Sequence, residues 1–173
     1  AITGALAGKL ANVLLASGSK RRHELLNQLG VKFKIVNQDV EESFSNDLRC
    51  SEITDYLAKK KSSLLVEKLK KNDLLITSDT IVWHKNRSLG KPKNRDEAFE
   101  MIKSLENSSH EVITSICIST IKSQVIVNEK TLVFFDKIDK NDLLYYTKTS
   151  DVLDRAGSYG IQDYIGHIGI KKI

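Results

Sequence analysis

The chain has 173 residues, of which 40% are hydrophobic and 28% are charged, and its net charge is +5. This length and apolar content suit a single domain with a real core and exclude a disordered chain. No apolar stretch is long enough to cross a bilayer as a helix, so a membrane span is not expected. The positive charge favours anionic partners such as nucleotides, although a lysine-rich composition alone gives the same sign.

Hydrophobic periodicity and turn residues predict an alternation of strands and helices. In chain order the expected elements are a strand at 13–16, a helix at 21–29, a strand at 32–36, a helix from 51 to about 71, strands at 74–77 and 81–83, a helix from 95 to 105, a hairpin of 111–121 with 125–135, and a last helix from 140 to about 147. Ser19, Ser51, Asn94 and Asp139 stand where side chains cap helices. This order indicates an α/β fold with a mixed twisted sheet and flanking helices, and the length leaves room for two lobes around a cleft.

The segment Ser17–Gly18–Ser19–Lys20–Arg21–Arg22 joins the first expected strand to the first helix. Free amides at a helix N-terminus carry partial positive charge and attract anions. Small residues let an anion approach the backbone, and Arg21 and Arg22 add planar charged groups that match phosphate oxygens. The pattern alone also fits an ordinary helix start with exposed arginines, so it leaves phosphate binding open.

Acidic residues follow two of the expected strands. Asp79 lies in Ser78–Asp79–Thr80, between two apolar runs. An aspartate at the end of a central strand can bind Mg²⁺ or take a proton from an attacking water, or it can simply cap a turn. Glu41 and Glu42 could supply a second metal ligand, while a solvated acidic loop is the simpler interpretation.

The remaining reactive residues give weaker signals. Lys61 lies in a lysine run, and such residues usually face solvent, whereas Lys91 precedes Pro92 and is held extended, so its side chain projects in a fixed direction. The histidines show no metal-binding spacing. Cys50 and Cys117 form neither a redox pair nor a zinc pattern, and free thiols fit a reducing, cytoplasmic compartment.

Several common motifs are absent from the sequence. It contains no Walker loop, no glycine-rich dinucleotide fingerprint and no nucleophile elbow of a serine hydrolase. Aromatic residues make up only 6%, so no platform for stacking single-stranded nucleic acid is expected. A nucleic-acid-binding module therefore ranks below an enzyme that acts on free nucleotides.

Seven short motifs occur along the chain in a fixed order. They are Leu15–Arg22, Val40–Glu42, Leu57–Ala58 with Lys61, Ser78–Val82, Gly90–Pro92, His110–Val112 with Thr114, and Ala156–Gln162. Any one of them is common, whereas all seven in this order and spacing are specific. Together they resemble the Maf family of nucleoside triphosphate pyrophosphatases, from about residue 13 to residue 162.

The resemblance implies a fold shared with inosine-triphosphate pyrophosphatases. It also implies hydrolysis of a nucleoside triphosphate to a monophosphate and pyrophosphate, with a divalent cation such as Mg²⁺, or Mn²⁺ or Co²⁺ in its place. By motif match, the catalytic residues would be Asp79, Glu42, Lys61, Lys91 and Arg21, with Asp79 and Glu42 as metal ligands. The substrate-binding residues would be Ser17, Ser19, Arg21, Arg22 and Gln162. Glu41 in place of Glu42 stays open.

The resemblance also points to a branch of the family. Asp79–Val82 and Gly160–Gln162 are similar to the branch that takes dTTP and UTP rather than 7-methyl-GTP. The chain departs from the family at Ser115, where glycine is usual, and it ends before the family's last few tens of residues. Residues 1–11 are expected to be a frayed or foreign start of a single Maf-like domain. A homodimer, and a protein that binds nucleotides without hydrolysing them, both stay open.

Overall fold

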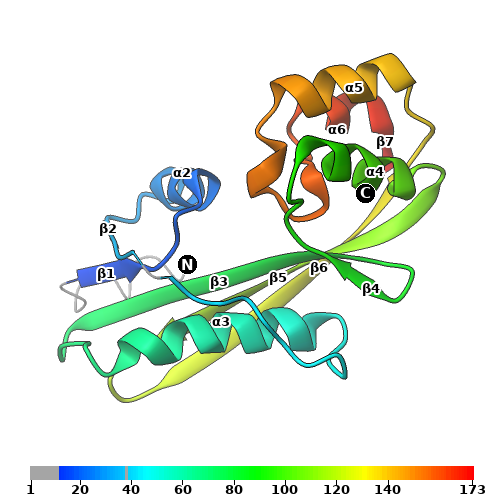
Figure 1. Cartoon of the computed structure of the whole chain (residues 1–173). Coiled ribbons are helices and arrows are strands. Elements are labelled where there is room, and N and C mark those ends of the chain that lie inside the picture. Colours follow the sequence, from blue (N-terminus) through cyan, green and yellow to red (C-terminus); the bar gives the residue numbers. More distant parts are fainter. Residues whose placement is uncertain (1–11, 38) are drawn as a thin grey trace. The chain divides into compact units, whose positions relative to one another are not determined.

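The computed structural model describes residues 12–37 and 39–173, so the expected irregular start lies outside the described residues. Its strands are β1 (Asn12–Leu15), β2 (Lys34–Ile35), β3 (Asp73–His84), β4 (Arg87–Leu89), β5 (Ser108–Ser119), β6 (Gln124–Phe135) and β7 (Ile170–Lys172) (Figure 1). Its helices are α2 (Lys20–Gln28), α3 (Ser51–Val66), α4 (Arg95–Leu105), α5 (Lys140–Thr149) and α6 (Tyr164–Gly169). No helix of this described part is long and apolar enough to cross a membrane.

The described strands form one mixed sheet in the order β2-β1-β3-β5-β6-β7, with β4 paired to β3. β1 runs parallel to β2 and β3, whereas β4 and β7 run antiparallel to β3 and β6. β5 and β6 are neighbours joined by residues 120–123, and so short a connection can only join antiparallel strands. The α/β class with a mixed sheet and flanking helices is confirmed.

The chain divides into two compact units. The first contains residues up to Asp79 together with Ser115–Asn128, and the second contains Thr80–Thr114 together with Glu129–Ile173. Each of β3, β5 and β6 contributes residues to both units. Two lobes were expected, and a cleft between them stays a prediction.

In the first unit, α3 lies along one face of the strands (Figure 1). Ile53 and Leu57 are buried, as the apolar spacing predicts, and Ala58 is buried as well. Leu64, which the same spacing places on the apolar side, is 53% exposed, so that part of the prediction is wrong. Hydroxyl groups also fix the helix on the sheet: Thr54 lies 2.6 Å from Ser115, Ser62 lies 2.7 Å from Ser119, and Thr77 donates to the carbonyl of Ala58 at 2.7 Å. The position of α3 over β3 and β5 is therefore set by polar as well as apolar contacts.

In the second unit, α4 packs against α5 around a core that includes Ile102, Leu105, Leu143 and Ile165. The predicted caps of these two helices are confirmed. The Asn94 side chain accepts a hydrogen bond from the amide of Glu97 at 2.8 Å, and Asp139 accepts one from Asn141 at 2.8 Å. α4 ends at Leu105, as the sequence predicts.

Several predicted boundaries are wrong. α3 ends at Val66 rather than near residue 71: the amides of Lys68 and Leu69 bond three residues back, to Leu65 and Val66, and the helical pattern stops. The strand expected at 32–36 is limited to β2. α5 is not the last helix, since α6 and β7 follow it and β7 pairs with β6.

Two serine caps are also corrected. Ser19 stands at the N-cap of α2, but its side chain makes no capping bond, and the helix begins one residue earlier than expected. Ser51 is the first residue of α3, and Cys50 occupies the N-cap with a positive φ of 49°. Cys50 is half-buried and Cys117 is buried, and both thiols are free.

Candidate active site

Asp79 lies inside β3 rather than in a break between two strands. β3 runs without interruption for 12 residues, so the predicted interruption at Ser78–Asp79–Thr80 is wrong. Side chains alternate along a strand, and Asp79 shares its face with Thr77, whose hydroxyl contacts α3. Asp79 is only 5% exposed and faces the same helix. A fixed strand therefore holds its carboxylate, rather than a mobile turn.

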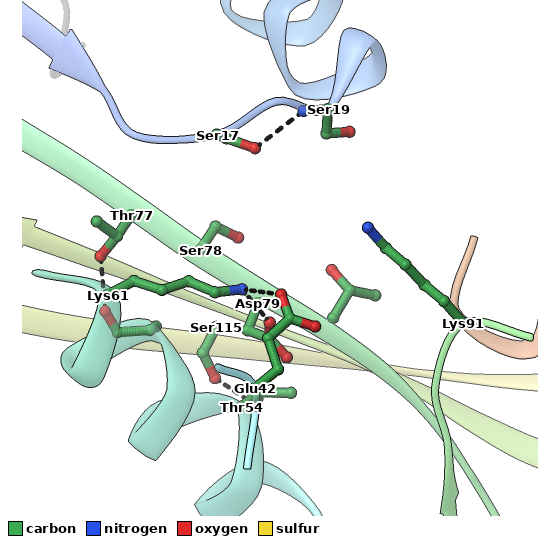
Figure 2. Close-up of polar contacts among 12 residues, drawn as sticks. Ser17, Ser19, Glu42, Thr54, Lys61, Thr77, Ser78, Asp79, Lys91 and Ser115 are labelled. Carbon is green, nitrogen blue, oxygen red and sulfur yellow. Dashed lines mark hydrogen bonds and ion pairs between the residues drawn. The ribbon is translucent and has the colours of Figure 1, made fainter. Parts of the chain in front are cut away.

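Lys61 of α3 joins two carboxylates. Its Nζ lies 2.6 Å from Oδ1 of Asp79 and 2.8 Å from Oε1 of Glu42 (Figure 2). The side chains of Lys61 and Asp79 are 12% and 8% exposed, whereas that of Glu42 is 51% exposed. The structure thus brings together three of the predicted catalytic residues. Of the two glutamates left open by the sequence, it places Glu42 beside Lys61, and both glutamates are exposed.

The electrostatic state of Asp79 follows from this position. Burial raises the pKa of Asp79 above its ordinary value of 3.8, and the nearby charge of Lys61 opposes the increase without cancelling it. Glu42 raises the pKa further and Arg22 lowers it. A carboxylate with a raised pKa is a stronger base than an exposed one, which is the property required to take a proton from water.

The Ser17–Arg22 segment forms the turn between β1 and α2. The Oγ of Ser17 accepts a hydrogen bond from the amide of Ser19 at 3.2 Å, as Figure 2 shows, and the backbone carbonyl of Ser17 lies 2.7 Å from Nε2 of His23. A Cβ added at Gly18 would meet no atom within 4 Å, so an anion has room to approach the backbone. The turn is thus held from within, and it leads into the amides at the start of α2.

Arg22 connects this turn to β3. Its Nη1 donates to Oγ of Ser17 at 3.2 Å and to the backbone carbonyl of Ser78 at 3.0 Å. Ser78 directly precedes Asp79, so the phosphate-binding turn predicted from the sequence lies next to the predicted catalytic carboxylate. Arg21 and Lys20 are exposed at the start of α2. Ser17, Ser19 and Arg22 are partly buried.

The contacts that hold α3 above β5 were not predicted from the sequence. Oγ of Ser115 lies 2.6 Å from Oγ1 of Thr54 and donates to Oδ1 of Asp55 at 2.6 Å. The amide of Asn128 donates to both oxygens of Asp55 at 3.2 Å. Ser115 is the residue at which the chain departs from the family pattern, and this departure was the available signal. Its hydroxyl helps to hold the helix that carries Lys61.

The carboxylates fit the chemistry of a hard divalent cation. Oδ1 of Asp79 and Oε1 of Glu42 both lie within 2.8 Å of one ammonium group, so both carboxylates face the same positive charge. Mg²⁺ typically binds one or two carboxylates together with substrate phosphates rather than a complete protein cage. The described residues include no cluster of three or more acidic, histidine or cysteine side chains arranged around a metal position.

Lys91 and Gln162 belong to the second unit, and their part in the site stays a prediction. Lys91 follows β4 and pairs with Asp154 at 2.6 Å, with both side chains about half exposed. The carbonyl of Gly90 accepts a hydrogen bond from the amide of Gly157 at 3.0 Å. Gly157 has a φ of 67°, and a Cβ there would meet Val82, so only glycine allows this close approach. Gln162 is exposed.

The chain is similar to known proteins over most of its length. A family model described as Maf-like protein matches residues 12–173. A dTTP/UTP pyrophosphatase of Flavobacterium johnsoniae is 43% identical over 165 residues, which are 95% of this chain and 85% of that protein. A dTTP/UTP pyrophosphatase of Flavobacterium psychrophilum is 47% identical over 161 residues, which are 93% of this chain and 83% of that protein.

A solved structure adds a likeness of fold. The Staphylococcus aureus Ham1 protein superposes with a TM-score of 0.52 at 14% identity, over 91% of this chain and 90% of that one. This likeness supports the predicted α/β fold with a mixed sheet. On the family match and the two relatives, the chain belongs to the Maf family.

Proposed function

We propose that the chain hydrolyses nucleoside triphosphates, dTTP and UTP among them, to a nucleoside monophosphate and pyrophosphate. The observation that carries this proposal is the buried ion pair of Asp79 and Lys61, with Glu42 beside it and the Ser17–Arg22 turn next to it. The Maf relatives named dTTP/UTP pyrophosphatase support this choice of substrates.

Each residue has a distinct task in this proposal. Asp79 accepts the proton of the water that attacks the α-phosphorus, because its raised pKa makes it an effective base. Lys61 holds the carboxylate in place and, with Arg21 and Lys91, offsets the charge that grows on the departing pyrophosphate. The turn residues bind the phosphates and Gln162 contacts the base.

A divalent cation is part of the proposal. Asp79 and Glu42 would hold Mg²⁺, or Mn²⁺ or Co²⁺ in its place, and the cation would neutralise phosphate charge.

A cytoplasmic location and a homodimer also belong to the proposal. The free thiols of Cys50 and Cys117 support the location, since free cysteines suit a reducing compartment.

The test is a panel of nucleoside triphosphates incubated with the chain in Mg²⁺ and, separately, in a chelator. Pyrophosphate and monophosphate are expected as the products of dTTP and UTP, and only when the cation is present. Inorganic phosphate and a nucleoside diphosphate as products would contradict attack at the α-phosphorus. Binding of the nucleotides without turnover would instead support the nucleotide-binding alternative.

Asp79→Asn tests the catalytic assignment. The variant is expected to lower kcat by about 10²–10³-fold, which is typical for loss of one well-placed catalytic group. Asp136→Asn is the matched control, because it removes an aspartate–lysine pair at the surface, where Asp136 lies 3.4 Å from Lys171. Unchanged turnover of dTTP and UTP by Asp79→Asn at saturating Mg²⁺ would show that Asp79 is not the base.

A further inference from the structure

Gln162 stands at the tip of a turn in the second unit. The amide of Asp163 donates to the carbonyl of Gly160 at 3.0 Å and closes the turn, so Ile161 and Gln162 form its two central residues. Ile161 packs against the core, whereas Gln162 is exposed. The backbone of the tip is therefore anchored while the amide side chain faces solvent.

Tyr146 of α5 forms hydrogen bonds with both ends of this turn. Its hydroxyl donates to Oδ2 of Asp163 at 2.6 Å and accepts a hydrogen bond from the amide of Gly160 at 3.3 Å. The residue is fully buried. Burial, and then the bond to Asp163, raise the pKa of Tyr146, so the hydroxyl keeps its proton and remains a donor.

Arg155 provides a second anchor for the same carboxylate. Its Nη1 lies 3.0 Å from Oδ2 of Asp163, and its Nε donates to the carbonyl of Asp151 at 3.2 Å. The side chains of Arg155 and Asp163 are 29% and 19% exposed, so water screens this pair less than a surface pair. One oxygen of Asp163 thus receives a hydroxyl and a guanidinium group.

Two glycines let these anchors come close to the turn. A Cβ at Gly160 would meet the guanidinium group of Arg155 and would lie 2.9 Å from Oδ2 of Asp163. A Cβ at Gly166 would meet the backbone carbonyl of Ile161. Side chains at either position would push the turn away from its support, so the backbone is tightly enclosed on these sides.

We propose that Tyr146, Arg155 and Asp163 are positioning residues for recognition of the nucleotide base. They hold the Gly160–Asp163 turn so that the amide of Gln162 meets the base in one orientation. This inference rests on the proposed function, in which Gln162 contacts the base. Backbone support of this kind lowers the ordering cost of binding, because the side chain alone remains to be fixed.

The chemistry of the amide explains why its orientation matters. A glutamine side chain offers one acceptor and two donors, which match the N–H and carbonyl groups of uracil or thymine. The same amide turned over matches the ring nitrogen and amino group of cytosine. A loosely held glutamine therefore accepts both kinds of pyrimidine, whereas a positioned one can favour uracil and thymine over cytosine.

Tyr146→Phe tests the proposal, with kcat and KM measured for UTP, dTTP and CTP. The variant keeps the buried ring and removes the hydroxyl that holds both ends of the turn. We expect KM for UTP and dTTP to rise by about tenfold, as one lost hydrogen-bonded contact implies, with a smaller change in kcat. The ratio of kcat/KM for UTP to that for CTP is expected to fall by a similar factor.

Tyr164→Phe is the matched control. It also removes a tyrosine-to-aspartate bond, at 2.9 Å from Asp142, but that bond lies at the exposed surface and does not touch the turn. The ratio of kcat/KM for UTP to kcat/KM for CTP is expected to be the same in this variant as in the unaltered chain. If Tyr146→Phe fails to fold, Asp163→Asn carries the test, because it keeps the shape of the side chain and removes the charge that Arg155 meets.

The combination with Gln162→Ala separates positioning from a general loss of stability. If the anchors act through Gln162, Tyr146→Phe added to Gln162→Ala changes the ratio no further. The inference would be overturned if the two substitutions changed the ratio of kcat/KM for UTP to that for CTP independently, so that their effects multiplied. It would also be overturned if Tyr146→Phe and Tyr164→Phe had the same ratio.

Failure of the proposed function gives a different result. The unaltered chain would then hydrolyse no nucleoside triphosphate, and calorimetric binding of the non-hydrolysable α,β-imido analogues of UTP and CTP replaces the kinetic ratio. A preference for the UTP analogue that Tyr146→Phe abolishes, and Tyr164→Phe retains, supports the inference without catalysis. No preference, or one that Tyr146→Phe leaves intact, rejects it.

Discussion

Asp79 carries two opposed requirements in a single residue. Its proposed role needs an ionised carboxylate, while its burial favours the protonated form and raises its pKa. Lys61 reduces this conflict at 2.6 Å without removing it. The ionised carboxylate is therefore held at a cost to stability, which is common at sites that perform chemistry.

A dependence of stability on pH follows from the sign of this shift. A raised pKa means that Asp79 stabilises the fold below 3.8, and that this contribution is lost as the pH rises through the folded pKa. Asparagine does not titrate, so the Asp79→Asn variant lacks this dependence on pH. We therefore subtract the free energy of unfolding of the unaltered chain from that of the variant, and we expect this difference to increase from acidic to neutral pH. Urea unfolding across this range measures the difference.

Asp136 provides a control of opposite sign. The amide of Lys137 and the charge of Lys171 lower the pKa of Asp136, so its carboxylate stabilises the fold above 3.8. The same difference for Asp136→Asn is expected to decrease as the pH rises. A decrease for Asp79→Asn as well would mean that Lys61 outweighs burial at Asp79.

Neighbouring glutamates give a second test at this scale. Glu42 approaches Lys61 at 2.8 Å and Glu41 is exposed. Glu42→Gln is expected to raise the Mg²⁺ concentration required for half-maximal rate by about tenfold, since one carboxylate ligand is lost. Glu41→Gln is expected to leave the Mg²⁺ dependence unchanged. The reverse pattern in a Mg²⁺ titration would transfer the role to Glu41.

At the scale of elements, α3 depends on buried hydroxyl pairs for its position. Ser115 contacts Thr54 and Asp55, and each of these keeps another partner, Ser51 or Asn128, when Ser115 is altered. Ser115→Ala is therefore expected to lower the free energy of unfolding by about 1 kcal/mol, the usual value of one hydrogen bond.

Glycine at this position, the usual family residue, is expected to cost more. Ser115→Gly adds the backbone entropy of glycine in a strand, about 0.5–1 kcal/mol beyond the alanine variant. Ser63→Ala is the control, because its exposed hydroxyl donates to the carbonyl of Lys60, one turn earlier in the same helix. Urea denaturation compares the three variants. Equal stability of the alanine and glycine variants would mean that strand entropy has no effect there.

The sequence predicted those elements whose signals are local. Asn94 and Asp139 lie at caps whose bonds form within three residues, and both predictions are confirmed. Ser19 does not cap α2 through its side chain, although it stands at the predicted position. A break between two strands was expected at Ser78–Asp79–Thr80, but β3 continues through it, and the carboxylate of Asp79 pairs with Lys61, 18 residues away.

The same distinction holds for the candidate site. Glu42, Lys61 and Asp79 were identified by motif, and the structure places them in contact. The roles of Ser115 and Tyr146 could not be predicted, because each acts on residues that are distant in sequence. A serine in a strand and a tyrosine in a helix show no pattern that reveals such partners.

At the scale of the whole molecule, the two units are expected to respond differently to acid. In the second unit, burial and then the neighbouring His84 lower the pKa of His110 to about 4 from its ordinary 6.5. Nδ1 of His110 and Nε2 of His84 are buried and have no hydrogen-bond partner among the described residues. A protonated His110 would bury a charge and an unsatisfied donor, so acid destabilises its surroundings. Asp79 in the first unit has a raised pKa and contributes most to stability at low pH.

Acid is therefore expected to destabilise the second unit. A lowered histidine pKa gives stability that is present above 6.5 and is lost as the pH falls toward 4. His110 alone is expected to account for a loss of about 2 kcal/mol by pH 5. Urea unfolding of His110→Gln is expected to lack this loss, and His167→Gln, altered at an exposed residue of α6, is expected to retain it.

Hydrogen exchange locates the effect. The protection factors of amides in α4 and β4, which are exchange rates corrected for the intrinsic effect of pH, are expected to be lower at pH 5 than at pH 7, while those of α3 change less. A larger loss of protection in α3 would contradict the assignment of acid sensitivity to His110.

The division of β5 and β6 between the units has a consequence for synthesis on the ribosome. The first unit includes residues 115–128, so its sheet cannot be completed until that hairpin has left the exit tunnel. Until then, the nascent chain carries β3 without its neighbour β5, so one edge of β3 presents unpaired backbone groups. Folding cannot proceed one unit after the other from the N-terminus, and the growing chain is most exposed to chaperones and aggregation after β3 has emerged and before residues 115–128 follow it.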